Sequence, residues 1–449
     1  MNPSSQIPRP AGSLVTHSLR FVKNTMKFYE EAFRECGDIF ATRIPGLGEW
    51  VYICSPEFVQ AMLEAPPDVM AGGDLGAATL SHVLGTGATS YLDGPALQER
   101  RDVTLPYLDT QGGLRLADDI REITLRHVAA WPLGQPFPLA RSLQKIALES
   151  LVKTFFNHAG PEKTRQLAEV YEDFSFRGLR SPTVSHPTLQ IDLGPWSPWG
   201  RVKKRQRAVV EVFAREIEDR LAALGQPRED DVVLGMARAR LRDGSRLSQD
   251  VILAEILDML FQGHELTGNS ATWTLGELFT HPEVLERLRE ELDSVVGEES
   301  VQSSHLPRLP YLEAVVNEGL RFRPSTPYTS VRLVKQPFPL GDYLLPEGTM
   351  LALCYPALAM REDVFANPKS FDPRNFYGKK LAPYTWNPFG GGSHQCMGQG
   401  LAEVVMKVAV ATIVRKTDLK LAQDEVRPVR SAYFYEPNKG LLVTLEKRL

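Results

Sequence analysis

Hydrophobic and polar positions follow a strand-like pattern in a short region near the start of the chain and a helical pattern in most of the rest. Ile39 to Ile44 and Trp50 to Cys54 are short β-prone runs, and the four residues from Pro45 to Gly48 carry a proline and two glycines. Short apolar runs separated by turn residues are typical of a hairpin. The pattern therefore predicts a small sheet in this region.

Most of the remaining chain has apolar residues at helical spacing, three or four positions apart. The longest amphipathic stretches lie around residues 114–131, 139–156, 162–176, 201–224 and 251–279. Residues 332–354 return to short β-prone pieces interrupted by prolines and glycines, which predicts a second small sheet. The fold is therefore expected to be mainly α with two small β-sheets.

The stretch from Pro368 to Pro388 has four prolines and no regular pattern. Loops of that length inside a compact domain usually carry function. No internal repeat and no change of composition divides the chain, so we expect one large domain.

Composition narrows the classes of partner. The net charge is −4 over 449 residues, with both signs interspersed, which does not provide the basic surface that nucleic acid requires. The four cysteines lie too far apart in sequence for a disulfide framework or a paired zinc site. Residues 1–12 are polar, and no run of about 20 apolar residues follows. We expect a cytoplasmic protein that does not span a membrane and that binds a small molecule.

A glycine-rich loop around Cys396 carries the strongest chemical signal. Three consecutive glycines precede the cysteine, and an apolar helix is predicted from about residue 401 to 414. A cysteine just before a helix lies at the positive end of the helix dipole, where the thiolate is favoured over the thiol. The alternative is an ordinary buried cysteine beside a glycine turn, because free cysteines are often buried.

The loop fills every fixed position of the pattern F-x-x-G-x-[HR]-x-C-x-G, with Phe389, Gly392, His394, Cys396 and Gly398. It resembles the haem-binding loop of the cytochrome P-450 family. The resemblance implies haem b (iron protoporphyrin IX) held by the Cys396 thiolate, a ligand that favours O–O cleavage. It also implies that Phe389 covers the sulfur, that His394 reaches a haem propionate, and that Gly398 lets the helix approach the porphyrin.

The resemblance extends from about residue 37 to residue 445, so we expect an N-terminal segment of residues 1–36 and a catalytic domain of residues 37–449. Glu318 and Arg321 match the family's E-x-x-R signature, which braces the segment before the cysteine loop. The family adds an arginine where this chain has Asn375, so either Arg374 or Asn375 completes that network. Family position also implies that Arg332 and Arg101 pair with haem propionates.

The stretch 251–279 predicts one long helix with Ser248 as its N-cap, and it is apolar except at its centre. The polar and glycine residues at that centre are Gln262, Gly263, His264, Glu265, Thr267, Gly268 and Asn269. A zinc-protease pattern H-E-x-x-H fails because its fifth position is Gly268.

This centre is similar to the family's oxygen-groove motif, [AG]-G-x-[DE]-T-[TS]. The motif implies that Gly263 loosens the helix and that Glu265 relays protons. It also normally has a threonine that donates a hydrogen bond to bound dioxygen, but this chain has Leu266 there. Three accounts remain open: Thr267 substitutes for that threonine, a substrate hydroxyl or ordered water supplies the proton, or the reaction does not follow the usual path.

The resemblance also places the substrate pocket in residues 70–91, 174–199 and 325–331, although each side chain there fits a plain core equally well. The expected pocket is mainly apolar with a few polar residues. Its residues are Leu75, Leu80, Val83, Leu84, Phe176, Leu179, Gln262, Tyr328 and Thr329. Residues 192–200 resemble bacterial members that act on fatty acyl chains, terpenoids or polyketides.

The expected function is that of a monooxygenase of secondary metabolism that hydroxylates or epoxidises such a molecule. Because the resemblance leaves no room for a fused redox module, electrons should come from a separate ferredoxin or flavodoxin with its reductase. Basic residues near the cysteine loop offer a docking surface, and they are Lys379, Lys380, Lys407, Arg415 and Lys416. We expect a monomer.

Two alternatives remain. Leu266 also suits a haem-thiolate isomerase, a dehydratase or a peroxide-driven catalyst. A haem-binding sensor without turnover belongs to another class of function, against which stand the acid and the glycine of the groove motif.

Overall fold

The computed structural model describes residues 7–44, 48–185, 189–222, 231–431 and 434–449. The chain forms two compact units, each assembled from separate segments. The first unit contains residues 1–76, 90–98 and 317–396, and the second contains residues 77–89, 99–316 and 397–449.

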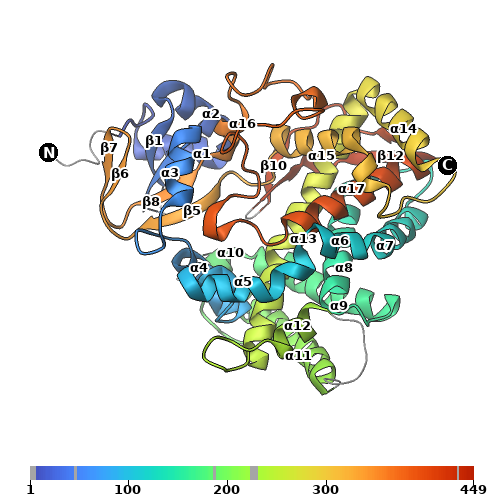
Figure 1. Ribbon diagram of the computed structural model, residues 1–449, viewed down its shortest axis with the longest axis horizontal. Helices are drawn as coiled ribbons and strands as arrows, with labels where there is room; N and C mark the ends of the chain where they lie inside the picture. Colours follow the sequence, from blue (N-terminus) through green and yellow to red (C-terminus); the bar gives the residue numbers. More distant parts are fainter. Residues whose placement is uncertain (1–6, 45–47, 186–188, 223–230, 432–433) are drawn as a thin grey trace. The chain divides into compact units, whose positions relative to one another are not determined.

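A five-stranded sheet organises the first unit (Figure 1). Its order is β1-β2-β8-β5-β3, formed by β1 (Ile39–Ile44), β2 (Gly48–Ile53), β8 (Met350–Leu353), β5 (Thr329–Val334) and β3 (Met70–Ala71). The predicted hairpin is confirmed by the antiparallel pairing of β1 with β2, while its turn residues 45–47 lie outside the described residues.

The predicted fold of helices with small separate sheets is confirmed, and the second sheet is present but shorter than the predicted segment. β5 and β8 join the sheet of the hairpin, and only β6 (Phe338–Leu340) and β7 (Tyr343–Leu345) form a pair of their own. β8 runs parallel to β2 and is buried at Leu351, Ala352 and Leu353. A short apolar run is compatible with either an edge or a central place, because the pairing partner is set by the tertiary fold.

The helices that cover this sheet come from the N-terminal part of the chain and from the segment directly after β8. They are α1 (Leu14–Lys23), α2 (Thr25–Cys36), α3 (Pro56–Glu64) and α16 (Tyr355–Ala359). Phe28 and Tyr29 of α2 share one buried cluster with Phe40 and Tyr52 of the hairpin, and the Phe40 and Tyr52 rings stack with centroids 5.3 Å apart. The domain boundary at residue 37 stays a prediction.

The second unit is mostly helical, and its helices confirm the five predicted stretches. These are α7 (Ala117–Ala130), α8 (Leu139–Phe155), α9 (Pro161–Phe174), α11 (Pro198–Ala222) and α13 (Gln249–Thr280). Shorter or later helices are α6 (Thr110–Arg115), α10 (Pro182–Ser185), α12 (Val232–Arg238), α14 (Pro282–Val296) and α17 (Gln399–Lys416). Three helices have residues in both units: α4 (Gly73–Leu84), α5 (Gly94–Leu108) and α15 (Pro310–Phe322).

Small sheets near the C-terminus were not predicted. β4 (Pro136–Pro138), β12 (Leu442–Arg448) and β9 (Thr417–Leu421) form one, and β10 (Pro428–Ser431) pairs with β11 (Phe434–Pro437). In the part of the chain that the structure describes, no helix combines the length and the apolar character needed to cross a bilayer.

The longest helix, α13, begins as predicted, because the Ser248 side chain accepts a hydrogen bond from the backbone N–H of Val251. It packs closely on α8 at Gly268, where a Cβ would lie 2.6 Å from the Cα and 2.7 Å from the backbone nitrogen of Gln144. The neighbouring Asn269 accepts a hydrogen bond from the Gln144 side chain at 2.8 Å. Gly268 therefore serves helix packing.

We expect Gly268→Ala to destabilise the protein by about 1–3 kcal/mol, the usual cost of forcing extra volume into a packed core. The backbone of α8 cannot move aside without separating two helices. The matched control is Gly263→Ala on the same helix, where the added Cβ meets only the end of the Leu151 side chain at 2.8 Å. Urea unfolding measures both, and equal midpoints for the two variants would contradict this packing role.

Candidate active site

The cysteine loop, up to Cys396, belongs to the first unit and is held by its own backbone. The Cys396 N–H donates to the Phe389 carbonyl at 3.0 Å, and Gly390 and Gly392 have φ of 68° and 66°. Gly392 has no room for a side chain, since a Cβ would lie 2.2 Å from the Leu63 carbonyl oxygen. This tight turn leads through Gly398, the N-cap residue of α17, into the helix.

Cys396 differs from the other three cysteines in its exposure. Its side chain is exposed, while Cys54 and Cys354 are buried and Cys36 is partly buried. Burial raises the pKa of the Cys354 thiol to about 12 and that of Cys54 well above its ordinary value. These two buried residues are inert thiols, whereas Cys396 is accessible at a helix N-terminus, as a reactive or ligating thiolate must be.

Arg332 lies on β5 and is only 5% exposed. Its guanidinium donates to the carbonyls of Val331 at 3.0 Å and of Gly391 at 3.3 Å, and Gly391 belongs to the cysteine loop. Burial lowers the pKa of Arg332 to about 10, and the Asp93 carboxylate partly opposes that shift. A buried guanidinium beside the loop is suited to pair with a carboxylate of a bound molecule.

His394 contacts Asp93, a residue that the sequence did not reveal as its partner. Its Nε2 lies 2.7 Å from Oδ1 of Asp93, which also accepts hydrogen bonds from the backbone N–H groups of Gly72 and Gly73 at 2.9 Å each. Burial raises the pKa of Asp93, but the hydrogen bonds from Gly72, His394 and Gly73 outweigh burial and lower it overall. Asp93 thus connects the cysteine loop to the start of α4.

The E-x-x-R pair is fully buried and ties down the segment before the cysteine loop. Arg321 binds both carboxylate oxygens of Glu318 at 2.6 and 2.8 Å. Its remaining N–H groups reach three backbone carbonyls at 2.8–2.9 Å, those of Ala359, Pro368 and Ser370.

The third member of this network is Asn375. Its amide donates to both oxygens of Glu318 at 3.3 Å. Arg374 instead pairs with Asp372, and its side chain is 76% exposed. The neutral amide replaces a charged guanidinium, so its hydrogen bonds to Glu318 are the weaker kind.

In the second unit, α13 is buried on all sides except at the centre of the groove motif. Between Ile252 and Leu278, the residues that are not buried are Gln262, Gly263 and Leu266. Positions 262 and 266 are one helical turn apart, and 263 lies beside them, so the three share one face. The motif therefore coincides with the one open patch of this helix between those residues.

Glu265 lies on another side of α13 and is held by two residues that were not predicted. It accepts hydrogen bonds from the Ser175 hydroxyl at 2.9 Å and from the Arg180 guanidinium at 2.9 Å. Ser175 begins and Arg180 directly follows a π-helical turn, Ser175–Leu179, that continues α9. Single π-turns are often found at functional sites, and they leave no clear sequence signal.

His264, the residue before this acid, is fully buried beside it. Its Nδ1 lies 2.6 Å from the carbonyl oxygen of Leu260. Burial lowers the pKa of His264, which favours the neutral imidazole.

Two further acids on α13 were also missed. Asp258 accepts a hydrogen bond from the Gln262 amide at 2.7 Å. Glu255 accepts from the Thr89 N–H at 2.7 Å and lies 3.8 Å from the Arg100 guanidinium, and burial raises the Glu255 pKa. The presence of acidic residues in an otherwise apolar helix was the sequence signal that could have revealed them.

Arg101, the predicted propionate partner, is half-buried on α5.

The predicted pocket residues in the second unit are mostly packed inside it. Leu84 and Leu179 are each 1% exposed, Val83 is fully buried, and Leu80 is half-buried. The Phe176 ring lies between two guanidiniums, with the carbon of Arg141 3.3 Å and that of Arg180 4.0 Å from its centroid. The Leu75 side chain lies outside the described residues.

In the first unit, Tyr328 packs against Trp50, with ring centroids 5.3 Å apart. Thr329 donates to the Asn387 carbonyl at 3.4 Å. Thr267, on α13 in the second unit, is 9% exposed.

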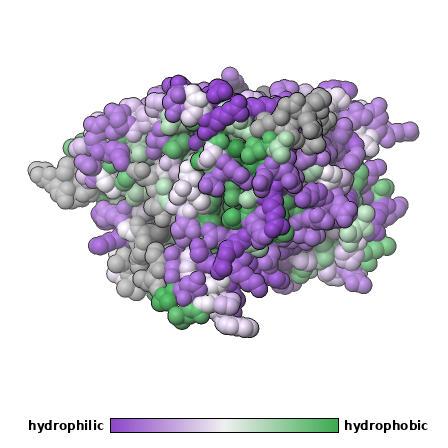
Figure 2. All heavy atoms as spheres, turned by 90° about the horizontal axis from the view of Figure 1, so that it is seen from below, coloured by the Kyte–Doolittle hydropathy of each residue, from purple (hydrophilic) through white to green (hydrophobic). Residues whose placement is uncertain are grey.

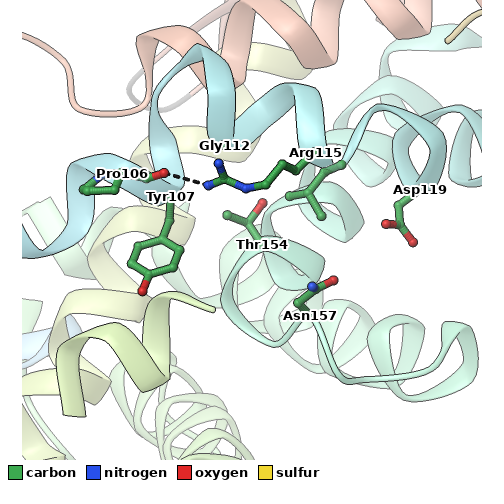
Figure 3. Close-up of a pocket in the computed structure, with 8 residues that line it drawn as sticks. Pro106, Tyr107, Gly112, Arg115, Asp119, Thr154 and Asn157 are labelled. Carbon is green, nitrogen blue, oxygen red and sulfur yellow. Dashed lines mark hydrogen bonds between the residues drawn. The ribbon is translucent and has the colours of Figure 1, made fainter. Parts of the chain in front are cut away.

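A cavity of about 660 Å³ lies elsewhere in the second unit, and no predicted site residue lines it (Figure 3). Its lining includes Pro106, Tyr107, Arg115, Asp119, Thr154 and Asn157.

Comparisons with known proteins agree with one another. The family model described as Cytochrome P450 matches residues 7–444. A Mycobacterium tuberculosis protein named cytochrome P450 138 is 29% identical over 413 residues, covering 92% of this chain and 90% of that protein. Cytochrome P450 135B1 of Mycobacterium bovis is 25% identical over 447 residues, covering 96% and 89%.

Solved structures show the same fold. The retinoic acid-bound cyanobacterial CYP120A1 has a TM-score of 0.84 at 20% identity, covering 99% of each chain. The haem domain of cytochrome P450DA has a TM-score of 0.85 at 19% identity, covering 99% of this chain and 98% of that one.

Proposed function

We propose that this chain, which belongs to the cytochrome P450 family and is therefore a haem monooxygenase, hydroxylates or epoxidises a mainly apolar small molecule. The resemblance seen in the cysteine loop is confirmed by the family match and by the relatives. The family binds haem through a cysteine thiolate. Bound haem supplies the activation of dioxygen, and the protein supplies binding, orientation and protons.

The residues of the first unit fit that cofactor. No group of three or more metal-ligating side chains occurs among the residues that the structure describes, so an iron on Cys396 must bring its other ligands with it. A porphyrin does so. The exposed Cys396 thiol would hold the haem iron, and the buried Arg332 would pair with a propionate. The Phe389 and His394 contacts with haem belong to the same proposal, while the contacts expected of Arg101 and Gly398, which lie in the second unit, stay predictions.

The open patch on α13 is the observation that carries the substrate proposal. Leu266 offers an apolar surface there, and Gln262, held by Asp258, offers an amide oxygen and a second N–H. A molecule bound against this patch would meet mainly carbon and one hydrogen-bonding group. We infer a substrate such as a terpenoid, polyketide or fatty acyl product of secondary metabolism, with a polar group near Gln262.

Proton supply is the role that we propose for Glu265. Its carboxylate is buried and contacts Arg180, whose side chain is 20% exposed and therefore reaches solvent. Ser175 adds a hydroxyl that can pass a proton to or from the carboxylate. The chain thus has a connected set of polar groups leading to the helix that bears Gly263 and Leu266.

We expect Leu266→Thr to increase the fraction of NADPH electrons that end in product instead of hydrogen peroxide. One added hydroxyl contributes a hydrogen bond of about 1 kcal/mol, or about a fivefold change in the product-to-peroxide ratio. Leu266→Val is the matched control, because valine has the shape of threonine without its hydroxyl. Product and peroxide are measured per NADPH consumed.

Three results would distinguish the possible sources of the proton. An equal gain from the valine variant would mean that side-chain size, and not the hydroxyl, limits coupling. Tight coupling in the unmodified protein that Thr267→Val does not change, with a substrate that has no hydroxyl, would remove both Thr267 and the substrate as proton sources. A loss of coupling in Thr267→Val alone would assign the role to Thr267.

A second candidate function rests on the same leucine. Without a hydroxyl at residue 266, a peroxide-driven oxidation, an isomerisation or a dehydration needs fewer protons delivered from α13 than dioxygen activation does. Turnover of a substrate with hydrogen peroxide alone, or with no oxidant and no reductase, would favour this candidate.

Electrons would come from a separate ferredoxin or flavodoxin and its reductase. The structure changes which lysines suit a docking test. Lys407 pairs with Glu313 at 3.2 Å and is only 14% exposed, and Arg415 donates to the carbonyls of Glu299 and Gly297. Lys379 and Lys380 are exposed, so charge reversal there is the better test of an acidic carrier.

A further inference from the structure

An exposed apolar loop lies between α10 and α11 in the second unit. We call residues 189–196 the apolar loop. Leu189, Ile191, Leu193 and Trp196 are exposed by 49%, 60%, 77% and 89%. Figure 2 shows one face of the molecule, on which hydrophobic residues form patches in a mostly hydrophilic surface. Single exposed apolar side chains are ordinary, but four within eight residues mark an interaction site.

Hydrogen bonds hold the apolar loop in this conformation. The Ser197 hydroxyl oxygen accepts from the N–H groups of Leu193 at 3.3 Å and Gly200 at 3.0 Å, and it donates to the Gly194 carbonyl at 2.8 Å. The Gly194 N–H donates to the Asp192 side chain at 3.0 Å. The apolar side chains are therefore presented outward by a built turn.

Positive charge follows directly in the sequence. The first turns of α11 carry five basic residues, and no acidic residue occurs from 193 to 210: Arg201, Lys203, Lys204, Arg205 and Arg207. We call these the basic turns. Arg205 pairs with Asp173 at 3.0 Å, whereas Arg201, Lys204 and Arg207 are exposed. An apolar tip is thus joined to a cationic flank.

We propose that the apolar loop and the basic turns dock on the surface of an anionic phospholipid bilayer. Trp196 and the aliphatic side chains would enter the interface between headgroups and acyl chains, where tryptophan is favoured. The basic turns would bind lipid phosphates, and each lysine or arginine near such a surface adds to the attraction. An acidic protein would match the charge but would not account for four apolar side chains beside it.

This inference goes beyond the proposed monooxygenase function and does not depend on its substrate. The residues involved lie outside the cysteine loop and outside the open patch of α13. A chain with no membrane-spanning helix among its described residues would then bind lipid peripherally, through two signals that each contribute part of the affinity.

The test uses the full-length haem-loaded protein and two kinds of vesicle, phosphatidylcholine alone and phosphatidylcholine mixed with phosphatidylglycerol. Flotation measures bound protein, and tryptophan emission reports insertion. We expect binding to the phosphatidylglycerol vesicles with a blue shift, and weaker binding at high salt. The pair Leu193→Ser with Trp196→Ser should reduce the protein that floats with the vesicles, and Lys204→Glu with Arg207→Glu should reduce binding at least about tenfold.

Matched controls change other exposed residues of the second unit, outside the apolar loop and the basic turns. Leu133→Ser, at a side chain 57% exposed, and Arg215→Glu, 72% exposed on the same α11, should leave vesicle binding unchanged. The haem spectrum should be the same in every variant. Absence of binding to either vesicle overturns the proposal. So does a dimer in lipid-free solution that the Leu193→Ser and Trp196→Ser pair dissociates, because a second copy would then occupy the loop.

Discussion

Cys396→Ser protein is expected to lose the red-shifted absorption band that a thiolate-ligated haem gives when reduced under carbon monoxide. A serine hydroxyl at the N-terminus of α17 stays protonated at neutral pH, so it would not replace the thiolate that holds the iron. Loss of a residue that hydrogen-bonds to a metal ligand typically costs about 10- to 100-fold in metal affinity or activity, and loss of the ligand itself should cost more. Spectroscopy and turnover are measured on the same samples.

The other cysteines provide the controls for that experiment. Cys36→Ser changes a partly buried thiol in α2 and should leave the band intact. Cys54 and Cys354 are buried thiols with raised pKa values, so they cannot take over the role of Cys396. A Cys396→Ser protein with an unchanged band would remove the basis of the whole functional assignment.

The parts of the site that could be predicted are those encoded within one continuous segment. The cysteine loop is ten residues long, and its glycines, its cysteine and the following helix all appear in the printed order. The α13 motif is similar, because helical periodicity alone places Gln262 and Leu266 on one face. The Ser248 N-cap was predicted for the same reason.

The partners of these residues could not be predicted, because they come from distant segments. Glu265 meets Ser175 and Arg180 about 90 positions earlier through a π-turn that has no sequence pattern. His394 meets Asp93 from 301 positions away. Such pairs depend on how the chain closes on itself, which local propensity and apolar period do not encode.

The pairing of the strands in residues 332–354 could be predicted only in part, for a related reason. The apolar period of residues 332–354 indicated strands, but it did not indicate that β8 would pair in parallel with β2 some 300 residues earlier. Long-range pairing is chosen by the burial of both faces of a central strand, and any apolar run of suitable length meets that need. Leu84 and Leu179, two apolar residues assigned to the pocket, are buried, and their place in a pocket stays a prediction, because hydrophobicity does not distinguish a cavity wall from a packed core.

Arg321→Leu is expected to lower the free energy of unfolding by about 3–5 kcal/mol, the typical cost of removing one partner of a buried ion pair. Glu318 and Arg321 are both 0% exposed, and the substitution leaves the Glu318 carboxylate buried with only the neutral Asn375 amide and the Asp372 N–H as donors. It also removes the donors that hold the carbonyls of Ala359, Pro368 and Ser370. Urea midpoints measure the loss.

Arg374→Ala is the control for that measurement, because it removes an arginine from the same segment whose ion pair with Asp372 is exposed. An exposed pair contributes about 0–1 kcal/mol, so the midpoint should hardly move. Glu318→Leu combined with Arg321→Leu should recover part of the stability, since no charge is then left buried. If the double variant were less stable than the unmodified protein by the sum of the two single losses, the three carbonyl hydrogen bonds, and not the uncompensated carboxylate, would carry the effect of Arg321.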